Sequence, residues 1–386
     1  MKKVALAINY DYHDYGGMLQ AFATQRALLK LGIDSEAIDF ENLKGDITKR
    51  KWQYFLSNIF DLTIVKEKAK IIEKKIKQKL NKNLRNNLEK RDTAFDRFCS
   101  TNFKVSRKFE SWKDLTESCN EYDSVIVGSD QLWLPSNIFA DYYTLNFVPD
   151  NINKIAYATS FGISDIPRKY ANMYSKFLSR INHLSAREIS GKAIIKKLTN
   201  RDVPQVCDPA LLLDSSDWDE IASPRIIPEK YIFCYFMGNN PDQRNFAQRL
   251  AAKTGCKIVA LLHLDQYIPS DDSYADYAPY DVTPSDFVSL VKHAEFVCTD
   301  SFHGTVFSVI YNRNFFTFMR FNNKASLSTN TRIESLLSTF KLTNRLFEGN
   351  ATIEDNLSIE NWTEIQQRVS ALRAASSKYL LESIVI

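Results

Sequence analysis

Short apolar runs of strand length alternate along this chain with longer segments of helical periodicity. The first unit is an apolar run at 3–9, a helical pattern at 18–31 and a second run at 35–40. The same order resumes with a strand-like run at 231–236 and a helical pattern at 243–254. Strands that alternate with helices in this way form parallel sheets. The pattern therefore predicts an α/β protein with two Rossmann-like domains that face each other across a cleft.

The length of the chain, 386 residues, also favours two domains, because a single hydrophobic core seldom grows that large. We expect an N-terminal domain at 1–222 that carries a basic helical insertion at 45–91. A proline-containing linker at 223–228 then leads to a C-terminal domain at 229–360. The tail at 361–386 has a helical pattern, and we expect a helix there that packs across the domains.

The composition is typical of a globular protein in water, with 44% hydrophobic and 25% charged residues. The six cysteines form no CxxC pair and no metal-ligand spacing with the five histidines. Several lie in apolar runs, which predicts free, buried thiols and a reducing, cytoplasmic setting. The first residues are typical of a first strand rather than of a signal peptide. No segment approaches the roughly 20 apolar residues that span a bilayer.

Positive charge is concentrated in one segment. Between Lys49 and Arg91 there are 14 Lys or Arg and 4 Asp or Glu, so the local net charge is +10. An apolar stripe with a spacing of four residues runs through it: Ile72, Ile76, Leu80, Leu84 and Leu88. One interpretation is a helical insertion that packs this stripe on its domain. The other is a surface that meets anionic lipid headgroups or an anionic lipid-linked substrate. Nucleic acid is not expected, since no DNA- or RNA-binding motif is present.

A cluster of small polar residues surrounds His303. It follows a short apolar run and precedes apolar residues with helical spacing. In an α/β sheet this order places 300–305 at the carboxyl end of a strand and the start of a helix. Such sheets bind ligands there, because helix N–H groups and the helix dipole attract anions. A histidine at that place changes protonation near neutral pH. It is either a functional residue or a hydrogen-bonded structural one.

Three other predicted strand ends carry polar side chains. In the segment 128–133, Asp130 is suited to hold sugar hydroxyls or to act as a base, unless it only caps the following turn. Trp133 either stacks on a sugar ring or fills the core. Arg187 lies at another strand end, where its planar fork suits a phosphate or carboxylate. The alternative is an ion pair with Glu188 or another acid. The turn at 9–20 contains no GxGxxG or Walker pattern, so no dinucleotide or P-loop nucleotide is indicated.

Taken in order, these segments resemble those of the polysaccharide pyruvyl transferases. The matching segments are 15–20, 128–133, 157–162, 185–188, 208–214 and 299–307. The resemblance implies a GT-B-like fold of two Rossmann-like domains. It also implies transfer of pyruvate from phosphoenolpyruvate to two hydroxyls of a sugar or lipid-linked oligosaccharide, with release of phosphate. The product would be a pyruvate ketal in a cell-surface polysaccharide or its precursor. No metal and no cofactor beyond this co-substrate is expected.

The resemblance also implies roles for individual residues. His303 is the expected general acid, and Asp130 the residue that orients or deprotonates an acceptor hydroxyl. The expected donor-binding residues are Arg187, Ser301, Gly304, Thr305, Arg320 and Arg332, with the backbone N–H groups of Gly304 and Thr305 facing the anion. The expected acceptor-binding residues are Asp14, Gly16, Gln20, Ser129, Gln131, Trp133 and Ser160.

The chain departs from the family at Ser301, where many members have an arginine. Arg320 and Arg332 follow within the same domain and are expected to supply that charge. Two other hypotheses stay open. One is a GT-B-type glycosyltransferase that uses a nucleotide sugar, and the other is a catalytically silent carbohydrate-binding relative. A pyruvyl transferase or a glycosyltransferase of this kind is expected in the cytoplasm. If the basic segment meets anionic lipids, we also expect peripheral contact with the inner face of the cell membrane.

Overall fold

A computed structural model gives the fold for residues 2–58, 81–263, 268–271, 273–320, 331–347, 351–353 and 357–385. The chain divides into two compact units. Unit 1 comprises Met1–Lys66, Asn102–Leu212 and Ser370–Ile386, and unit 2 comprises Glu67–Thr101 and Leu213–Val369. The predicted linker at 223–228 thus lies inside unit 2, and part of the segment assigned to an N-terminal insertion groups with unit 2. Each unit is described by itself below.

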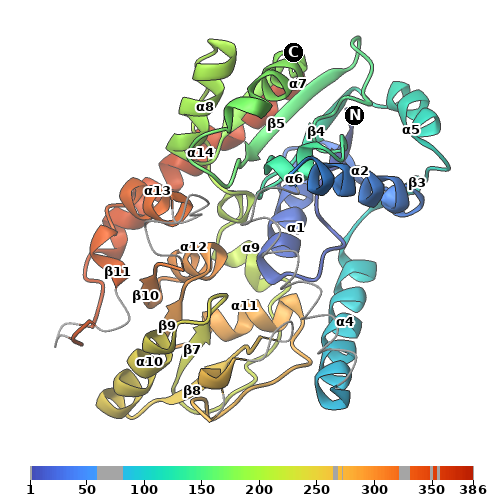
Figure 1. The fold of residues 1–386 in the computed structure, drawn as a ribbon. Helices are drawn as coiled ribbons and strands as arrows, with labels where there is room; N and C mark the ends of the chain where they lie inside the picture. Colours follow the sequence, from blue (N-terminus) through green and yellow to red (C-terminus); the bar gives the residue numbers. More distant parts are fainter. Residues whose placement is uncertain are drawn as a thin grey trace. The chain divides into compact units, whose positions relative to one another are not determined.

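Unit 1 is a six-stranded parallel sheet with the strand order β3-β2-β1-β4-β5-β6. Figure 1 labels three of these strands, β3, β4 and β5. The strands are β1 (Lys3–Ala7), β2 (Asp34–Asp39), β3 (Val105–Lys108), β4 (Ser124–Val127), β5 (Asn153–Thr159) and β6 (His183–Ala186). The helices are α1 (Tyr15–Lys30), α2 (Lys44–Ser57), α5 (Trp112–Ser118), α6 (Pro135–Ile138), α7 (Ala171–Arg180) and α8 (Ile189–Thr199). The short 3-10 helix η4 (Pro209–Leu212) packs on α1.

Unit 2 is a five-stranded parallel sheet with the order β11-β10-β9-β7-β8. Its strands are β7 (Tyr231–Tyr235), β8 (Lys257–Ala260), β9 (Phe296–Thr299), β10 (Asn314–Phe318) and β11 (Leu346–Phe347). Its helices are α9 (Ser215–Asp219), α10 (Pro241–Thr254), α11 (Pro284–Lys292), α12 (Phe302–Ile310) and α13 (Thr331–Thr339), together with nearly all of α4 (Lys82–Asn102). The prediction of an α/β protein with two Rossmann-like domains is confirmed.

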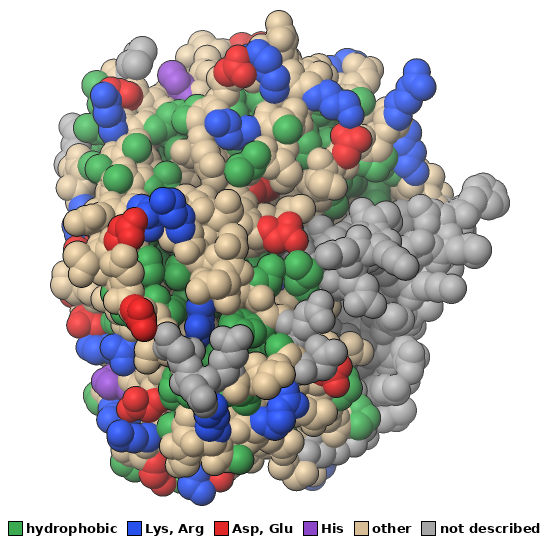
Figure 2. Space-filling model, turned by 90° about the vertical axis from the view of Figure 1, so that its left-hand side faces the viewer, with side chains coloured by type: hydrophobic (Ala, Val, Ile, Leu, Met, Phe, Trp, Pro, Cys, Tyr) green, Lys and Arg blue, Asp and Glu red, His purple; other side chains and the backbone are tan. Residues whose placement is uncertain are grey.

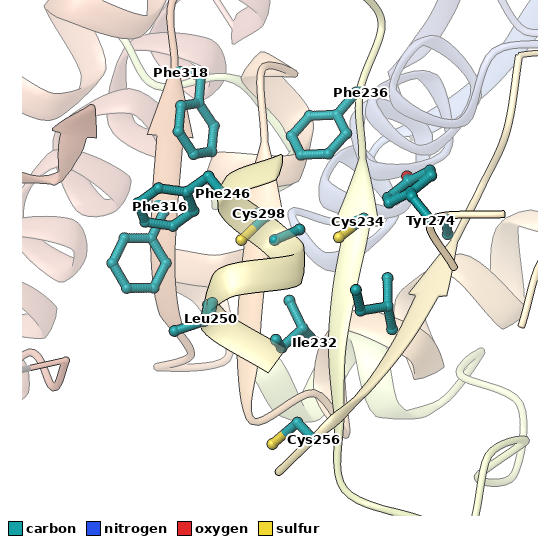
Figure 3. Close-up of a cluster of buried hydrophobic side chains, with 13 residues drawn as sticks. Ile232, Cys234, Phe236, Phe246, Leu250, Cys256, Tyr274, Cys298, Phe316 and Phe318 are labelled. Atoms are coloured by element: carbon teal, nitrogen blue, oxygen red, sulfur yellow. The ribbon is translucent and has the colours of Figure 1, made fainter. Parts of the chain in front are cut away.

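The core of unit 2 is built from the apolar sequences of its strands. Figure 3 shows Cys234 and Cys298, from neighbouring strands, at the centre of a buried cluster with aromatic rings around them. Phe246 of α10 lies 5.0 Å from the ring of Phe316 and 5.2 Å from that of Phe318, both on β10. Continuous apolar strands of this kind belong to parallel sheets covered on both faces. The packed strands therefore hold their carboxyl ends in fixed positions.

The last helix, α14 (Trp362–Val385), contributes residues to both units. In unit 2, Gln366 Nε2 donates to the carbonyl of Val309 at 2.7 Å. In unit 1, Ser376 Oγ accepts the amide of Cys207 at 2.9 Å. Specific hydrogen bonds thus fix each part of the helix within its own unit.

The predicted apolar stripe of the basic segment falls largely outside the described residues, which include only Leu84 and Leu88, both half-buried in α4. In α2 no residue is buried, and Trp52 and Leu56 are 46% and 61% exposed. Over the face drawn in Figure 2, basic and acidic side chains are interspersed, so positive charge does not gather there among the described residues. None of the helices described is long and apolar enough to cross a membrane.

All six cysteines are free, and all but Cys99 are buried. Burial raises the pKa of Cys119 to about 12 and that of Cys207 to about 11. Because the thiolate is the reactive form, we expect a thiol reagent at pH 8 to label the native protein first at Cys99. Peptide mapping by mass spectrometry checks this order. Rapid native labelling of Cys119 or Cys207 would contradict the burial of these thiols.

Candidate active site

The carboxyl edge of the unit 2 sheet contains a tight turn from β9 into α12. Ser301 caps the helix, since its Oγ accepts the amide of Gly304 at 3.3 Å and its carbonyl accepts the amide of Thr305 at 3.1 Å. A serine in this position satisfies N–H groups that the helix itself leaves unpaired. Thr299 Oγ1 accepts the amide of Ser301 at 3.0 Å and donates to the carbonyl of Tyr235 on β7 at 2.6 Å. The turn is therefore fixed to the neighbouring strand.

These contacts give the predicted donor-binding residues Ser301, Gly304 and Thr305 structural roles within the turn. The N–H groups of Gly304 and Thr305 were expected to face the donor anion, but both are bonded to Ser301 within the turn. Ser301 serves as the helix cap, which gives a structural reason for a serine at a position where an arginine was expected.

Gly304 lets α12 start directly against β9. A Cβ at this position would lie 2.5 Å from Thr299 Oγ1, a contact that requires the helix start to move. We expect Gly304→Ala to lower the free energy of unfolding by about 1–3 kcal/mol, as overpacking does, and to displace His303. Urea denaturation measures this. Gly45→Ala in α2 is the matched control, since a Cβ there meets nothing within 4 Å. Equal stabilities of the two variants would contradict the close contact.

Asp300 ties three strand ends of unit 2 together. Its fully buried carboxylate accepts the amides of Met237, at 2.6 Å, and Gly238, at 2.8 Å, which follow β7. Arg320 follows β10 and donates from Nη2 to the carbonyl of Asp300 at 3.3 Å. A Cβ on Gly238 would lie 2.8 Å from Asp300 Oδ2, so only glycine allows this approach. The side chain of Arg320 remains 23% exposed.

His303 lies in the first turn of α12 and is 6% exposed. The centres of its ring and of the Phe302 ring lie 5.2 Å apart, and the two ring planes are at 87° to each other. The guanidinium of Arg332, from α13, lies 5.7 Å from the centre of the same Phe302 ring. The structure thus places Arg320 and Arg332 in the same unit as His303. Arg320 contacts Asp300, and Arg332 contacts Phe302, so both arginines touch the motif at 300–303. Two guanidinium groups and a histidine suit an anion with several charged oxygens.

The carboxyl edge of the unit 1 sheet is arranged around Arg187. This guanidinium donates from Nη1 to Asp208 Oδ2 at 2.5 Å and lies 3.8 Å from Glu188 and 3.9 Å from Asp130. Its side chain is only 3% exposed. Burial by itself lowers the pKa of Arg187, but the three carboxylates outweigh burial and raise it above its ordinary value. The alternative of an ion pair is thus what the structure contains, and three carboxylates around one cation disfavour an anionic donor here.

Asp130 and Ala158 adopt left-handed backbone conformations at this edge, with φ values of 78° and 55°. Non-glycine residues pay about 1–3 kcal/mol for such conformations, and they cluster at functional sites. The carbonyl of Asp130 accepts the amide of Ser160 at 2.9 Å, and the carbonyl of Ala158 accepts Ser129 Oγ at 3.1 Å. The carboxylate of Asp130 is 24% exposed, whereas those of Asp208 and Glu188 are at most 2% exposed. Asp130 is therefore the acid of this cluster that can meet a ligand.

Two serines predicted to bind the acceptor have partners inside the chain. Ser160 Oγ donates to Glu188 Oε1 at 2.7 Å, and Ser129 Oγ shares its one proton between the carbonyl of Ala158, at 3.1 Å, and Asp208 Oδ2, at 3.2 Å. Both are fully buried, so they support the cluster rather than face a ligand. Gln131 differs, because its Nε2 has no hydrogen-bond partner within the described part of the chain.

Trp133 fills the core, which is the second of its two predicted roles. Its ring is fully buried, packs at 5.1 Å from Phe161 and 5.5 Å from Phe177, and donates from Nε1 to the carbonyl of Tyr143 at 3.0 Å. A ring used in this way has no face left for a sugar. The alternative of a core tryptophan is therefore the one we keep.

The turn before α1 is also used within the chain. Asp14 caps α1 by accepting the amide of Gly17 at 2.7 Å, and Gly16 lies buried in the first turn. Gln20 is fully buried and donates from Nε2 to the carbonyl of Gly17 at 2.8 Å. These residues thus have roles in the helix start, and their contact with the acceptor stays a prediction.

Comparison with known proteins identifies the family. A family model described as "Polysaccharide pyruvyl transferase" matches residues 14–320, most of the chain. The chain belongs to the polysaccharide pyruvyl transferase family. The matched span of this pyruvyl transferase family member includes Asp130, Arg187, His303 and Arg320 and ends before Arg332. No curated protein matches the chain.

Solved structures of low sequence identity resemble this family member along nearly its whole length. UDP-GlcNAc 2-epimerase from Neisseria meningitidis, bound to UDP-GlcNAc, is 13% identical with a TM-score of 0.44, and 96% of this chain and 100% of that chain are covered. MurG from Acinetobacter baumannii is 9% identical with a TM-score of 0.42, and coverage is 100% and 99%. The E. coli ADP-heptose heptosyltransferase II is 11% identical with a TM-score of 0.38, and coverage is 97% and 99%.

Proposed function

We propose that this family member transfers pyruvate from phosphoenolpyruvate to a hydroxyl pair of a sugar, in a cell-surface polysaccharide or its precursor, and forms a pyruvate ketal. One observation carries the proposal beyond family membership. The carboxyl edge of the unit 2 sheet combines a histidine in the first turn of a helix with two arginines, Arg320 and Arg332, each of which contacts a residue of the motif.

The charges of unit 2 suit this donor. Phosphoenolpyruvate carries a carboxylate and a phosphate, and a guanidinium binds either group bidentately. Arg320 and Arg332 take the role that many family members assign to an arginine at the position of Ser301. Arg187 is left out of the donor contacts, because the carboxylates around it already use its charge.

The proton balance of the reaction defines what the site has to do. The methylene carbon of phosphoenolpyruvate takes up a proton, which makes the neighbouring carbon electrophilic. One sugar hydroxyl adds there, the bond to phosphate breaks, and the second hydroxyl closes the ketal. Two hydroxyl protons are lost, one of which ends on carbon and the other on phosphate. His303 is the general acid of the first step.

In unit 1, Asp130 and Gln131 are the acceptor residues that we retain. The carboxylate of Asp130 is partly exposed and held by a strained backbone, which is the preorganisation that a hydroxyl-binding group needs. The amide of Gln131 is a further donor. We place the acceptor contacts of the reaction on these two side chains.

Donor selectivity tests the proposal without knowledge of the acceptor. Phosphoenolpyruvate at 100 times its Kd stabilises the folded protein by about 2.7 kcal/mol and raises its Tm, whereas UDP-N-acetylglucosamine has no effect. Arg320→Met is expected to weaken the shift, while Arg313→Met, at the opposite end of β10, leaves it unchanged. A shift with the nucleotide sugar alone would favour a glycosyltransferase. No shift with either donor would favour a silent carbohydrate-binding relative.

We also propose peripheral contact with an anionic membrane through α2. Trp52 and Leu56 lie one turn apart on the same exposed face, and the exposed Lys49 lies one turn before Trp52. Apolar side chains next to a cation are typical of helices that lie in the membrane interface. This contact would place the enzyme at the inner face of the cell membrane, beside a lipid-linked acceptor.

Vesicle sedimentation tests this contact. We expect the protein to bind vesicles of phosphatidylcholine and phosphatidylserine, and Trp52→Ser/Leu56→Ser to bind about 100-fold more weakly, since two buried apolar side chains together contribute about 3 kcal/mol or more. Met173→Ser, another exposed apolar residue of unit 1, is the control. Equal binding of the double variant and the wild type would rule out α2 as the contact.

A further inference from the structure

A second histidine follows a strand of the unit 2 sheet at the same edge as His303. We propose that His263 is a further acid–base residue of the pyruvyl transfer site, positioned by Asp271 and Arg244. This inference rests on the function proposed above, and it adds a residue that neither the sequence motifs nor the family match single out.

The topology brings His263 to the donor edge. Strand β8 ends at Ala260, and its pairing with β7 continues in the bond from the amide of Leu261 to the carbonyl of Cys234 at 3.1 Å. His263 therefore leaves the sheet at the carboxyl end of β8. The strand order places β7 between β8 and β9, and neighbouring strands lie about 5 Å apart. The ends of β8 and β9 are thus about 10 Å apart, a distance that a phosphorylated acid together with a sugar hydroxyl bridges.

A buried ionic chain holds the imidazole. His263 Nδ1 lies 3.2 Å from Asp271 Oδ2, and Arg244 Nε donates to Asp271 Oδ1 at 2.8 Å. The side chains of Arg244, Asp271 and His263 are 2%, 9% and 7% exposed. Arg244 lies 4.9 Å from the ring centre of Phe236 and also donates to the carbonyl of Asn240 at 3.2 Å. A buried charge pair gives little net stability over an apolar core, so its presence at a sheet edge points to positioning.

Because Asp271 pairs with Nδ1, the Nε2 atom of His263 is left to accept or give a proton. Burial by itself raises the pKa of Asp271, but the hydrogen bond with His263 and the charge of Arg244 outweigh burial and lower it. An ionised Asp271 accepts from Nδ1–H, and this fixes the tautomer in which Nε2 carries the lone pair, as in a serine protease triad. Nε2 is buried and has no hydrogen-bond partner in the described residues. A buried polar atom of this kind is costly unless a ligand uses it.

The proposed reaction needs a second proton carrier, because two hydroxyl protons have to leave while His303 delivers one proton to carbon. His263 Nε2 takes the proton of the first attacking hydroxyl as its oxygen bonds to the central carbon. The resulting imidazolium is stabilised by Asp271 and returns the proton to the bridging oxygen as the carbon–phosphate bond breaks. The proton of the second hydroxyl recharges His303. The balance closes with ketal and hydrogen phosphate as products.

Imidazole NMR on the unmodified protein tests the placement of His263. The chain has five histidines, and single His→Gln variants assign their C–H signals. We expect saturating phosphoenolpyruvate to move the signals of His263 and His303 and to leave that of His293, at the opposite end of the sheet, unchanged. Movement of His303 without His263, or of neither, overturns the placement. If both move with UDP-N-acetylglucosamine and neither with phosphoenolpyruvate, His263 belongs to the site and the proposed donor fails.

Kinetics tests the role. His263→Asn keeps a short amide that donates to Asp271 but removes Nε2. We expect its kcat for acceptor-dependent phosphate release to fall about 100-fold or more, with the Kd of phosphoenolpyruvate changed less than about threefold. Added imidazole is expected to restore part of the rate of His263→Ala, which a structural histidine would not permit. His293→Asn is the control. A kcat of His263→Asn within threefold of the wild type overturns the acid–base role.

Discussion

Replacing His303 by glutamine is expected to slow acceptor-dependent phosphate release from phosphoenolpyruvate by about 10²–10⁴-fold, the contribution of one general acid. This corresponds to about 3–5 kcal/mol of transition-state stabilisation. Glutamine retains polarity and length but supplies no proton, so the Kd of phosphoenolpyruvate should change far less than kcat. A coupled phosphate assay and calorimetry measure the two quantities.

The control for this experiment is His293→Gln. His293 ends α11 on the opposite side of the sheet, where its Nδ1 lies 2.9 Å from the carbonyl of Ser289. The His293→Gln variant should leave kcat unchanged. If His303→Gln retains wild-type kcat with an unchanged Tm, the histidine of the motif is structural and the proposed acid is wrong.

Replacing Arg187 by methionine is expected to lower the free energy of unfolding by about 3–5 kcal/mol, because it leaves the buried carboxylate of Asp208 without its cation. The side chains of Arg187 and Asp208 are 3% and 0% exposed, so water does not replace the lost partner. Urea denaturation followed by tryptophan fluorescence measures the loss. The affinity for phosphoenolpyruvate, measured on the folded fraction, should change little.

A double variant separates this explanation from a role in donor binding. In Arg187→Met/Asp208→Asn the buried charge of Asp208, the carboxylate nearest to Arg187, is removed, while the asparagine oxygen can still accept the amide of Ala210. We expect it to recover more than half of the lost stability. A single Arg187→Met variant that is as stable as the wild type but binds phosphoenolpyruvate at least tenfold more weakly would return this arginine to the donor site.

The fold was predictable because it depends on local periodicity. Apolar runs of strand length that alternate with helical patterns predict two parallel sheets, and both sheets are present. The division of the chain was less predictable. Nearly all of α4 groups with unit 2 and the last part of α14 with unit 1, and both groupings depend on contacts between segments far apart in the sequence.

The candidate site was predictable as a set of strand ends but not as a set of partners. The segments at 128–133 and 299–307 lie at carboxyl ends of strands, as expected. Asp208 pairs with Arg187, and Asp300 accepts the amide of Gly238. Both contacts depend on which strands are neighbours in the sheet, and the sequence alone does not give that order. His263 carried no motif, because its partners Arg244 and Asp271 come from a helix and a short turn on either side of it.

The most direct test of the account is the stoichiometry of the reaction itself. The protein is incubated with phosphoenolpyruvate and a panel of aryl glycosides with free hydroxyl pairs, and phosphate and products are followed by ³¹P and ¹H NMR. The account predicts one phosphate released for each ketal methyl group formed, only when an acceptor is present, and neither product with His303→Gln. Glycosyl transfer from a nucleotide sugar in the same panel, with phosphoenolpyruvate left intact, would contradict it.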